Sequence, residues 1–231
     1  MGNRDDNHET IEVWCWPRLI GRNERDIRDR GHVELKIGDH FYTFLPDNPK
    51  FIEGTQKEEY KLRLINPDRR RRDAEAFFGG YAGLIRVAEV PNILSSYRDV
   101  YDEELPYFLE EGIDLQVVII VGQFVIGNEK VKELINFFES KMTERHSMND
   151  ILYYSNIEYF YKSKQESRNC ATFCFEALQS SGVIGEGEAL GGDGHLPDDF
   201  IEFLRKKSDE GLVTLRAGKY RPAAFIFEKE V

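Results

Sequence analysis

Cysteine is scarce in this chain, and its spacing does not indicate a disulfide framework. The 231 residues contain three cysteines, Cys15, Cys170 and Cys174, an odd number that does not suit a protein stabilised by disulfides. Neither a CxxC pair nor a paired-histidine motif accompanies them, and zinc sites usually show one of these spacings. We therefore expect free thiols, no bound metal and no cofactor.

Basic residues are outnumbered, which argues against one large class of partners. Lys and Arg total 31 against 42 Asp and Glu, so the formal net charge is −11. A general nucleic-acid-binding surface needs an excess of positive charge, and we expect no nucleic-acid partner. The basic run at 69–72 is flanked by Asp68, Asp73 and Glu75. Such mixed charge indicates a solvated helix face.

Long apolar runs are missing as well. The longest, LQVVIIVGQFVIG at 115–127, is too short and too rich in β-branched residues to cross a bilayer. The first ten residues are polar and lack the apolar centre of a signal peptide. We expect a soluble protein that is made in the cytoplasm and has no transmembrane segment. Any export would need a route other than a classical signal peptide.

The chain does contain a clear β-hairpin signal. Two alternating runs, 32–37 and 40–46, lie on either side of a Gly-Asp pair, and a two-residue turn there pairs Ile37 with His40. Because directly paired residues share a face, one face of the hairpin is apolar apart from a single histidine. That face carries Val33, Leu35, Ile37, His40, Tyr42 and Phe44. The other face carries His32, Glu34, Lys36, Phe41, Thr43 and Leu45.

Further elements follow from apolar spacing and from chain breaks. We expect strands over 10–19, 113–124 and 223–230, and helices over 128–145 with Asn128 as cap, from Cys170 to Gly182, and over 197–207. The aromatic segment 150–164 fits either a helix or a strand. Several Pro and Gly breaks in 47–110 predict short helices and loops. We expect one domain over 1–231, with an insertion at about 47–110.

The segment SRNCATFC, 167–174, places a cysteine where a helix can activate it. A thiol is a weak nucleophile until it loses its proton, and the positive end of a helix lowers its pKa. Ser167 or Asn169 can cap a helix that has Cys170 in its first turn. Cys174, one turn later, suits a buried structural thiol. For Cys170 itself, the residues alone leave two interpretations open: a nucleophile or a small packed core residue.

A catalytic thiol needs a base, and five histidines are available. Three of them fit solvated or structural roles: His8, His40 and His146. His32 opens a strand on the polar face of the hairpin, where the Thr43 hydroxyl can hold its ring. His195 lies in a glycine-rich loop later in the chain. Spacing does not decide between His32 and His195 as the base.

Three segments carry a family resemblance: GHVELKIGDHFYTFLP (31–46), SRNCATFCFEALQSSGV (167–183) and LPDDFIEFL (196–204). They resemble the circularly permuted papain-like families, in which a strand-borne histidine precedes a helix-borne cysteine. These families include the permuted NlpC-like cysteine peptidases and the lecithin retinol acyltransferase-like enzymes. Among them, the chain resembles a bacterial group, some of them secreted effectors, that has a glycine-histidine at a strand start and an asparagine-cysteine helix later.

The resemblance implies an α+β fold of permuted papain-like (NlpC-like) order, with an antiparallel sheet packed against the helix that carries the cysteine. It implies Cys170 as nucleophile, His32 as base and Thr43 as the residue that orients the base. Thr43 stands where related families have His, Ser or another polar residue. Asn169 and Tyr42 become candidates for substrate binding or for the oxyanion hole.

The implied reaction is cleavage of an amide bond, peptide or peptidoglycan-like, through a thioester on Cys170. The backbone N–H of Cys170 would meet the oxyanion, and a side chain of the aromatic run before the helix is a second candidate donor. A non-water acceptor would make the same site a thiol acyltransferase or thioesterase acting on lipid or small-molecule acyl groups. A third interpretation is a binding module without chemistry. The similarity to effectors also implies delivery into a target cell and an inhibitory partner protein.

Overall fold

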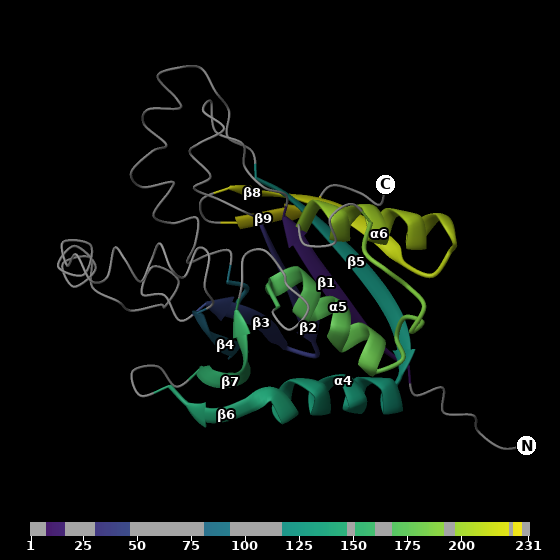
Figure 1. The fold of residues 1–231 in the computed structure, drawn as a ribbon. Coiled ribbons are helices and arrows are strands. Elements are labelled where there is room, and N and C mark those ends of the chain that lie inside the picture. The colour runs from purple at the N-terminus through teal and green to yellow at the C-terminus, as the bar shows by residue number, and fades with distance from the viewer. Residues whose placement is uncertain are drawn as a thin grey trace, which may run out of the picture.

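The described part of the chain is an α+β arrangement built on one antiparallel sheet. The computed structural model describes residues 8–16, 31–46, 81–92, 117–146, 151–159, 168–191, 197–221 and 224–227. These residues form a nine-stranded sheet and three helices (Figure 1). All strand pairs in the sheet are antiparallel. The α+β class expected from the sequence is confirmed.

The strands lie in the spatial order β6-β7-β4-β3-β2-β1-β5-β8-β9. The central positions are therefore taken by the N-terminal strands. In chain order the strands are β1 (His8–Trp16), β2 (His32–Ile37), β3 (His40–Pro46), β4 (Tyr81–Ala88), β5 (Val117–Gly127), β6 (Met142–Arg145), β7 (Leu152–Tyr159), β8 (Thr214–Arg221) and β9 (Ala224–Phe227).

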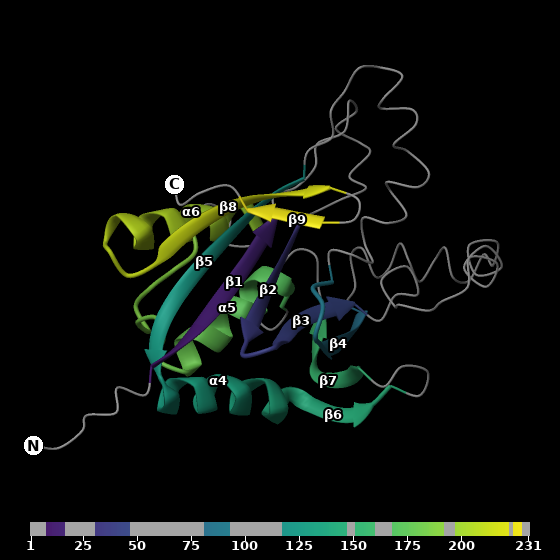
Figure 2. The same cartoon turned by 180° about the vertical axis from the view of Figure 1, so that it is seen from behind.

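The three helices of the described residues lie on one face of this sheet. They are α4 (Asn128–Lys141), α5 (Cys170–Ser180) and α6 (Pro197–Asp209). Figure 1 shows α5 and α6 in front of β1 and β5, and Figure 2, from behind, shows the strands in front of the helices. Both α5 and α6 bury their apolar residues against the sheet, as amphipathic helices of this length do.

The β2–β3 hairpin is confirmed in the register that the sequence predicts. Ile37 pairs with His40 and Leu35 pairs with Tyr42. Gly38 has a φ of +57°, a value that a glycine adopts without steric cost and that two-residue hairpin turns require. This register fixes which side chains of β2 and β3 face the helices.

The apolar face of the hairpin is the face that the helices cover. The Phe44 ring stacks on Phe173 of α5, with centroids 4.2 Å apart, and the Tyr42 ring lies 4.8 Å from that of Phe138 in α4. Val33 and Leu35 are fully buried in the same core. Residues at the intervening positions of β2 and β3 therefore point away from the helices.

Several predicted elements are confirmed, and others are wrong. The predicted helices appear as α4, α5 and α6, but the helix expected over 128–145 ends at Lys141, and residues 142–145 form β6. The ambiguous aromatic segment contains the strand β7. Asn128 was predicted as the cap of α4, but the N-cap is Gly127, and no side chain caps this helix. Strand β8 was not anticipated.

The expectation of short helices and loops over 47–110 is wrong for residues 81–88. Residues 81–88, where short helices and loops were expected, form β4. This strand pairs with β3 on one side and β7 on the other, so it belongs to the body of the sheet. The rest of 47–110, apart from residues 89–92, lies outside the described residues. Within the segments that are described, no helix has the length and apolar character needed to cross a membrane.

Gly83 lies where β4 pairs with β7, and a substitution at this position tests that pairing. It lies at a register shift, and an added Cβ would meet the backbone oxygen of Ile157 at 2.2 Å and the Phe44 ring at 2.5 Å. Backbone cannot yield as a flexible side chain can, so Gly83→Ala should lower the free energy of unfolding by about 2 kcal/mol or more. Urea denaturation measures this loss.

The matched control is Gly187→Ala, because a Cβ there meets nothing within 4 Å. Its free energy of unfolding should stay within about 0.5 kcal/mol of the wild-type value. Equal effects of the two substitutions would contradict the described contact between β4 and β7.

Candidate functional site

Cys170 is the first residue of α5, and Asn169 caps that helix. The Asn169 Oδ1 accepts a hydrogen bond from the Thr172 backbone N–H at 2.9 Å. In return, the Asn169 backbone N–H donates to the Thr172 Oγ1 at 2.9 Å, which completes a reciprocal capping box. Of the two residues expected as possible caps, Asn169 is therefore the one that caps α5. Ser167 lies outside the described residues. The predicted position of Cys170 in the first helical turn is confirmed.

The Cys170 thiol is buried next to several polar groups. Its residue is 4% exposed. Burial raises the pKa of the thiol to about 11, although the Tyr159 side chain and the backbone at Val33, Ala171 and Cys170 itself act to lower it. At neutral pH the sulfur is therefore protonated in this arrangement.

All three cysteines are buried around Val33. Cys174 Sγ donates to the Val33 carbonyl oxygen at 3.7 Å, and Cys15 is the cross-strand partner of Val33. Burial first, and then the neighbouring Cys170 sulfur, raises the pKa of Cys15 and of Cys174 well above the usual value. Cys174 is fully buried, as its predicted structural role requires.

His32 and Thr43 meet on the other face of the sheet, as the hairpin register predicts. The His32 Nε2 and the Thr43 Oγ1 form a buried hydrogen bond. The imidazole also lies against Trp16, with ring centroids 5.0 Å apart. Burial first, and then the positive charge of the Arg86 guanidinium, lowers the pKa of His32 to about 3. The ring is therefore neutral at physiological pH.

Around this pair lies a cluster of buried polar residues that we call the back-face cluster. Both carboxylate oxygens of Glu34 accept from the Asn92 backbone N–H, at 3.1 and 3.2 Å. Arg86, the cross-strand partner of Thr43, donates to the Val90 carbonyl oxygen at 2.8 Å. All members of the cluster are at most 8% exposed: His32, Glu34, Thr43, Arg86 and Asn92.

Sequence reasoning missed two members of the back-face cluster. Arg86 and Asn92 both lie in the range expected to be an insertion. A signal for Arg86 exists, because a single arginine interrupts the apolar run LIRVA of a strand. That position indicates either a solvated side chain or a buried charge with partners.

The structure does not bring Cys170 and His32 together. The Cys170 sulfur lies on the helix-covered face beside Val33, whereas the His32 ring lies on the opposite face with Trp16 and Thr43. No hydrogen bond joins the thiol to this imidazole, and His32 is absent from the groups that shift the thiol pKa. The physical reason is strand alternation: residues 32 and 33 are neighbours in sequence and point to opposite sides of β2.

Tyr42 and His195 complete the predicted set. Tyr42 is on the helix-covered face, packed on Phe138, and burial raises the pKa of its hydroxyl, with Glu139 adding to the shift. None of its described contacts reaches Cys170. His195 lies outside the described residues, two positions before Pro197, the first residue of α6.

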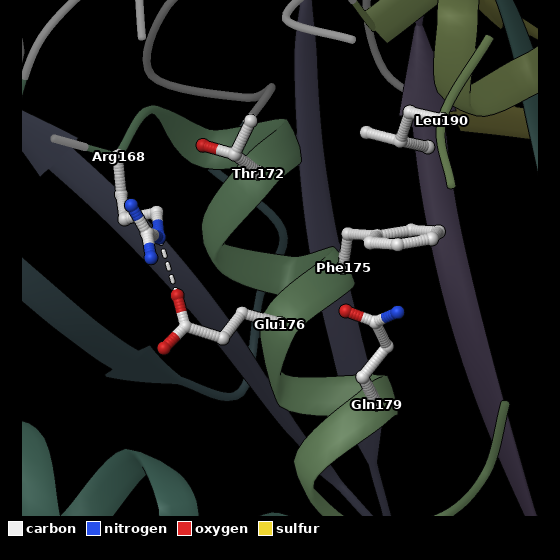
Figure 3. A pocket seen from close by; sticks show the side chains of 6 residues that line it. All are labelled: Arg168, Thr172, Phe175, Glu176, Gln179 and Leu190. Atoms are coloured by element: carbon white, nitrogen blue, oxygen red, sulfur yellow. Dashed lines mark hydrogen bonds and ion pairs between the residues drawn. The ribbon is translucent and has the colours of Figure 1, made fainter. Parts of the chain in front are cut away.

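A small pocket lies on the outer side of α5 (Figure 3). Its volume is about 220 Å³, and its lining residues are Arg168, Thr172, Phe175, Glu176, Gln179 and Leu190. Arg168 and Glu176 form an ion pair across it, and Gln179 donates to carbonyl oxygens of residues 185, 186 and 188. These residues are on the opposite side of α5 from the buried Cys170. The pocket is therefore not the entrance to the thiol.

Among the described residues, no group of three His, Cys, Asp or Glu side chains is placed to hold a metal ion. Comparison of the chain with protein-family models, with curated proteins and with solved structures finds no match. A function must therefore be argued from the residues and their geometry.

The cap of α5 gives the next prediction. Asn169→Ala removes the acceptor for the Thr172 N–H and should lower the free energy of unfolding by about 1 kcal/mol. Thermal or urea unfolding measures the change. Asn128→Ala is the matched control, because Asn128 does not cap α4 and its buried Oδ1 has no hydrogen-bond partner. The cap assignment fails if the Asn128 variant loses as much stability as the Asn169 variant.

The buried His32 predicts acid sensitivity with a definite sign. Its pKa is lowered from 6.5 to about 3 in the folded state, so between these values the unfolded chain binds a proton that the folded chain excludes. The contribution of the neutral His32 ring to the free energy of unfolding is fully present above pH 6.5. It falls by on the order of 5 kcal/mol as the pH falls toward 3. His32→Gln should flatten this part of the stability profile.

Urea unfolding at pH values from 7 to 4 measures the effect. His40→Gln is the control, because His40 is exposed at the hairpin turn. A His32 variant that loses stability with acid as steeply as the wild type would contradict the buried neutral ring.

Proposed function

We propose that this chain is a cysteine-dependent hydrolase that cleaves an amide bond, in a peptide or a peptidoglycan-like substrate, through a thioester on Cys170. The observation that carries the proposal is the position of Cys170 as the first residue of α5, directly after Asn169, which caps the helix together with Thr172. The helix presents unpaired backbone N–H groups at this end, where negative charge is favoured. Neither Cys15 nor Cys174 has such a position.

The donors around the sulfur support the same proposal. Backbone hydrogen bonds at Cys170 and Ala171 and the Tyr159 side chain all lower the thiol pKa, so each favours the thiolate. In the proposed reaction the same N–H groups would receive the oxyanion that forms next to the sulfur. A core cysteine that only fills space has no need of several donors.

The proposed base is His32, with Thr43 as its hydrogen-bond partner. The backbone of Val33, one residue from His32, is among the groups that lower the pKa of the Cys170 thiol. For the ring to reach the sulfur, it must leave Thr43 and turn to the helix side at the first residue of β2. Gly31, directly before it, has a φ of +68° and gives this strand end backbone freedom. His195 stays the alternative base.

In the proposed reaction the base takes the proton from the Cys170 thiol, and the sulfur attacks the acyl carbon. A bond forms between sulfur and carbon, and the carbonyl electron pair moves to the oxyanion. The base then protonates the leaving nitrogen as the carbon–nitrogen bond breaks. Water, deprotonated by the same base, releases the acid from the thioester. The permuted papain-like order, with the histidine strand before the cysteine helix, is part of this proposal.

A second candidate, a binding module without chemistry, is favoured by one specific observation. Burial holds the Cys170 pKa near 11, and the His32 ring is bonded to Thr43 on the far face. Such an arrangement suits two buried, inert groups. This candidate predicts that an electrophile such as iodoacetamide labels Cys170 no faster than the same cysteine in the unfolded chain.

Matched variants test the hydrolase. Purified peptidoglycan and a mixture of unstructured peptides serve as substrates, and newly released amino groups are measured. Cys170→Ala and His32→Ala should each lower the rate about 100-fold or more, because each removes a reacting group. Cys174→Ala and His40→Ala are the controls and should retain activity.

The same experiment includes His195→Ala. Loss of activity in that variant, with His32→Ala active, would move the role of base to His195 and leave the hydrolase standing. Activity that survives in Cys170→Ala on every cleaved substrate would end the proposal. An acyl group that persists on Cys170 and passes to an added alcohol or amine would indicate the acyltransferase instead.

A further inference from the structure

The pocket on the outer side of α5 contains an amide whose orientation is fixed. The Gln179 Nε2 donates to the carbonyl oxygens of residues 185, 186 and 188, at 3.4, 3.2 and 2.9 Å. A carboxamide has its donors on nitrogen and its acceptor on oxygen, so these bonds decide which way the group faces. Figure 3 shows the Gln179 oxygen turned toward Glu176 and the nitrogen turned away from it. The Gln179 Oε1 therefore faces the pocket as an acceptor.

Glu176 supplies a second acceptor on the same side of α5. Residues three apart on a helix are surface neighbours, and both Glu176 and Gln179 line the pocket. The Glu176 Oε2 accepts from the Arg168 Nε, and this ion pair holds the carboxylate in place. Among the described residues, no group donates to the Glu176 Oε1 or to the Gln179 Oε1. Two acceptor atoms in the pocket are therefore open to a ligand.

The rest of the lining is apolar or already engaged. The Phe175 ring is held edge-on by Phe200 and Phe203 of α6, with centroids 5.9 and 5.1 Å away, and Leu190 packs against the core. The Thr172 hydroxyl belongs to the capping box of α5. The volume of about 220 Å³ is below the roughly 300 Å³ of sites for drug-sized ligands. The pocket therefore suits a group the size of one side chain, with an apolar stem and a donor at its end.

We propose that this pocket binds a primary alkylammonium group, from a lysine side chain or a free amine, through the Glu176 carboxylate and the Gln179 Oε1. An ammonium carries three N–H donors and no acceptor, so it can satisfy both oxygens at once, while its stem lies against Phe175 and Leu190. An anion would meet two acceptors. The net charge of −11 also attracts cations. The pocket faces away from Cys170, so this inference does not depend on the hydrolase.

The ion pair gives the test a sign. Pentylammonium chloride is titrated into the ¹⁵N-labelled full chain at pH 7 and constant ionic strength, and amide shifts at residues 168–190 report its Kd. Glu176→Gln keeps the shape but removes the charge, so the Kd should rise about fivefold. Arg168→Met removes the cation that competes for the carboxylate, so the Kd should fall about threefold.

Two controls separate a built site from general attraction of cations. Glu186→Gln removes the same charge from an exposed residue nearby, and its Kd should stay within about twofold of the wild-type value. Tetramethylammonium has the charge but no N–H donor, and it should bind the wild type at least about fivefold more weakly than pentylammonium does. Far-UV circular dichroism verifies the folding of each variant, and the comparison of ligands requires only the wild type.

The inference is overturned if tetramethylammonium binds as well as pentylammonium, if pentanoate binds better than either, or if folded Glu176→Gln keeps the wild-type Kd. Nα-acetyl-lysine amide distinguishes the two sources of the ammonium. Tighter binding than that of pentylammonium indicates a lysine side chain in a peptide, and equal or weaker binding indicates a free amine. Either result supports the site.

Discussion

Alternation of side chains along β2 and β3 is the constraint on which the site depends. Val33, Tyr42 and Phe44 point toward α4 and α5 and help to form the core, so residues 32 and 43 must point away. The same rule that joins His32 to Thr43 therefore separates His32 from Cys170. The His32 ring and the Cys170 thiol therefore lie on opposite sides of β2.

Burial has opposite consequences for these two halves. It raises the pKa of the Cys170 thiol and lowers that of His32, so both groups are kept neutral. The position of Cys170 at the helix start and the polar groups near its sulfur lower the pKa of the thiol, but they offset only part of the rise that burial causes. A productive site would require the ring to approach the thiol, because an adjacent imidazolium stabilises a thiolate far more than neutral donors do. The buried charges of Glu34 and Arg86 keep the back face polar, with hydrogen bonds to residues 90 and 92 that join β4 to this cluster.

Much of this geometry could be predicted from the sequence, where local chemistry decides it. The hairpin register follows from two alternating runs around a Gly-Asp turn, and the helix start at Cys170 follows from an asparagine with good capping chemistry. The two faces of the hairpin were also predictable. The apolar inner face of α5 requires that the Val33 side of the hairpin, and not the His32 side, faces the helices. Strand β4 was missed because glycines and prolines on both sides of it indicate loops. Its place between β3 and β7 depends on contacts far apart in sequence, which local patterns do not report.

The central claim is that Cys170 carries an acyl group during catalysis. The most direct test is to incubate the folded protein with a peptide p-nitrophenyl ester and to follow the mass of the three cysteine peptides over time. The account predicts an acyl adduct on Cys170 that forms first, then decays as water cleaves the thioester, with none on Cys15 or Cys174. The account is contradicted if Cys170 gains no adduct while the same ester acylates all three cysteines of the unfolded chain.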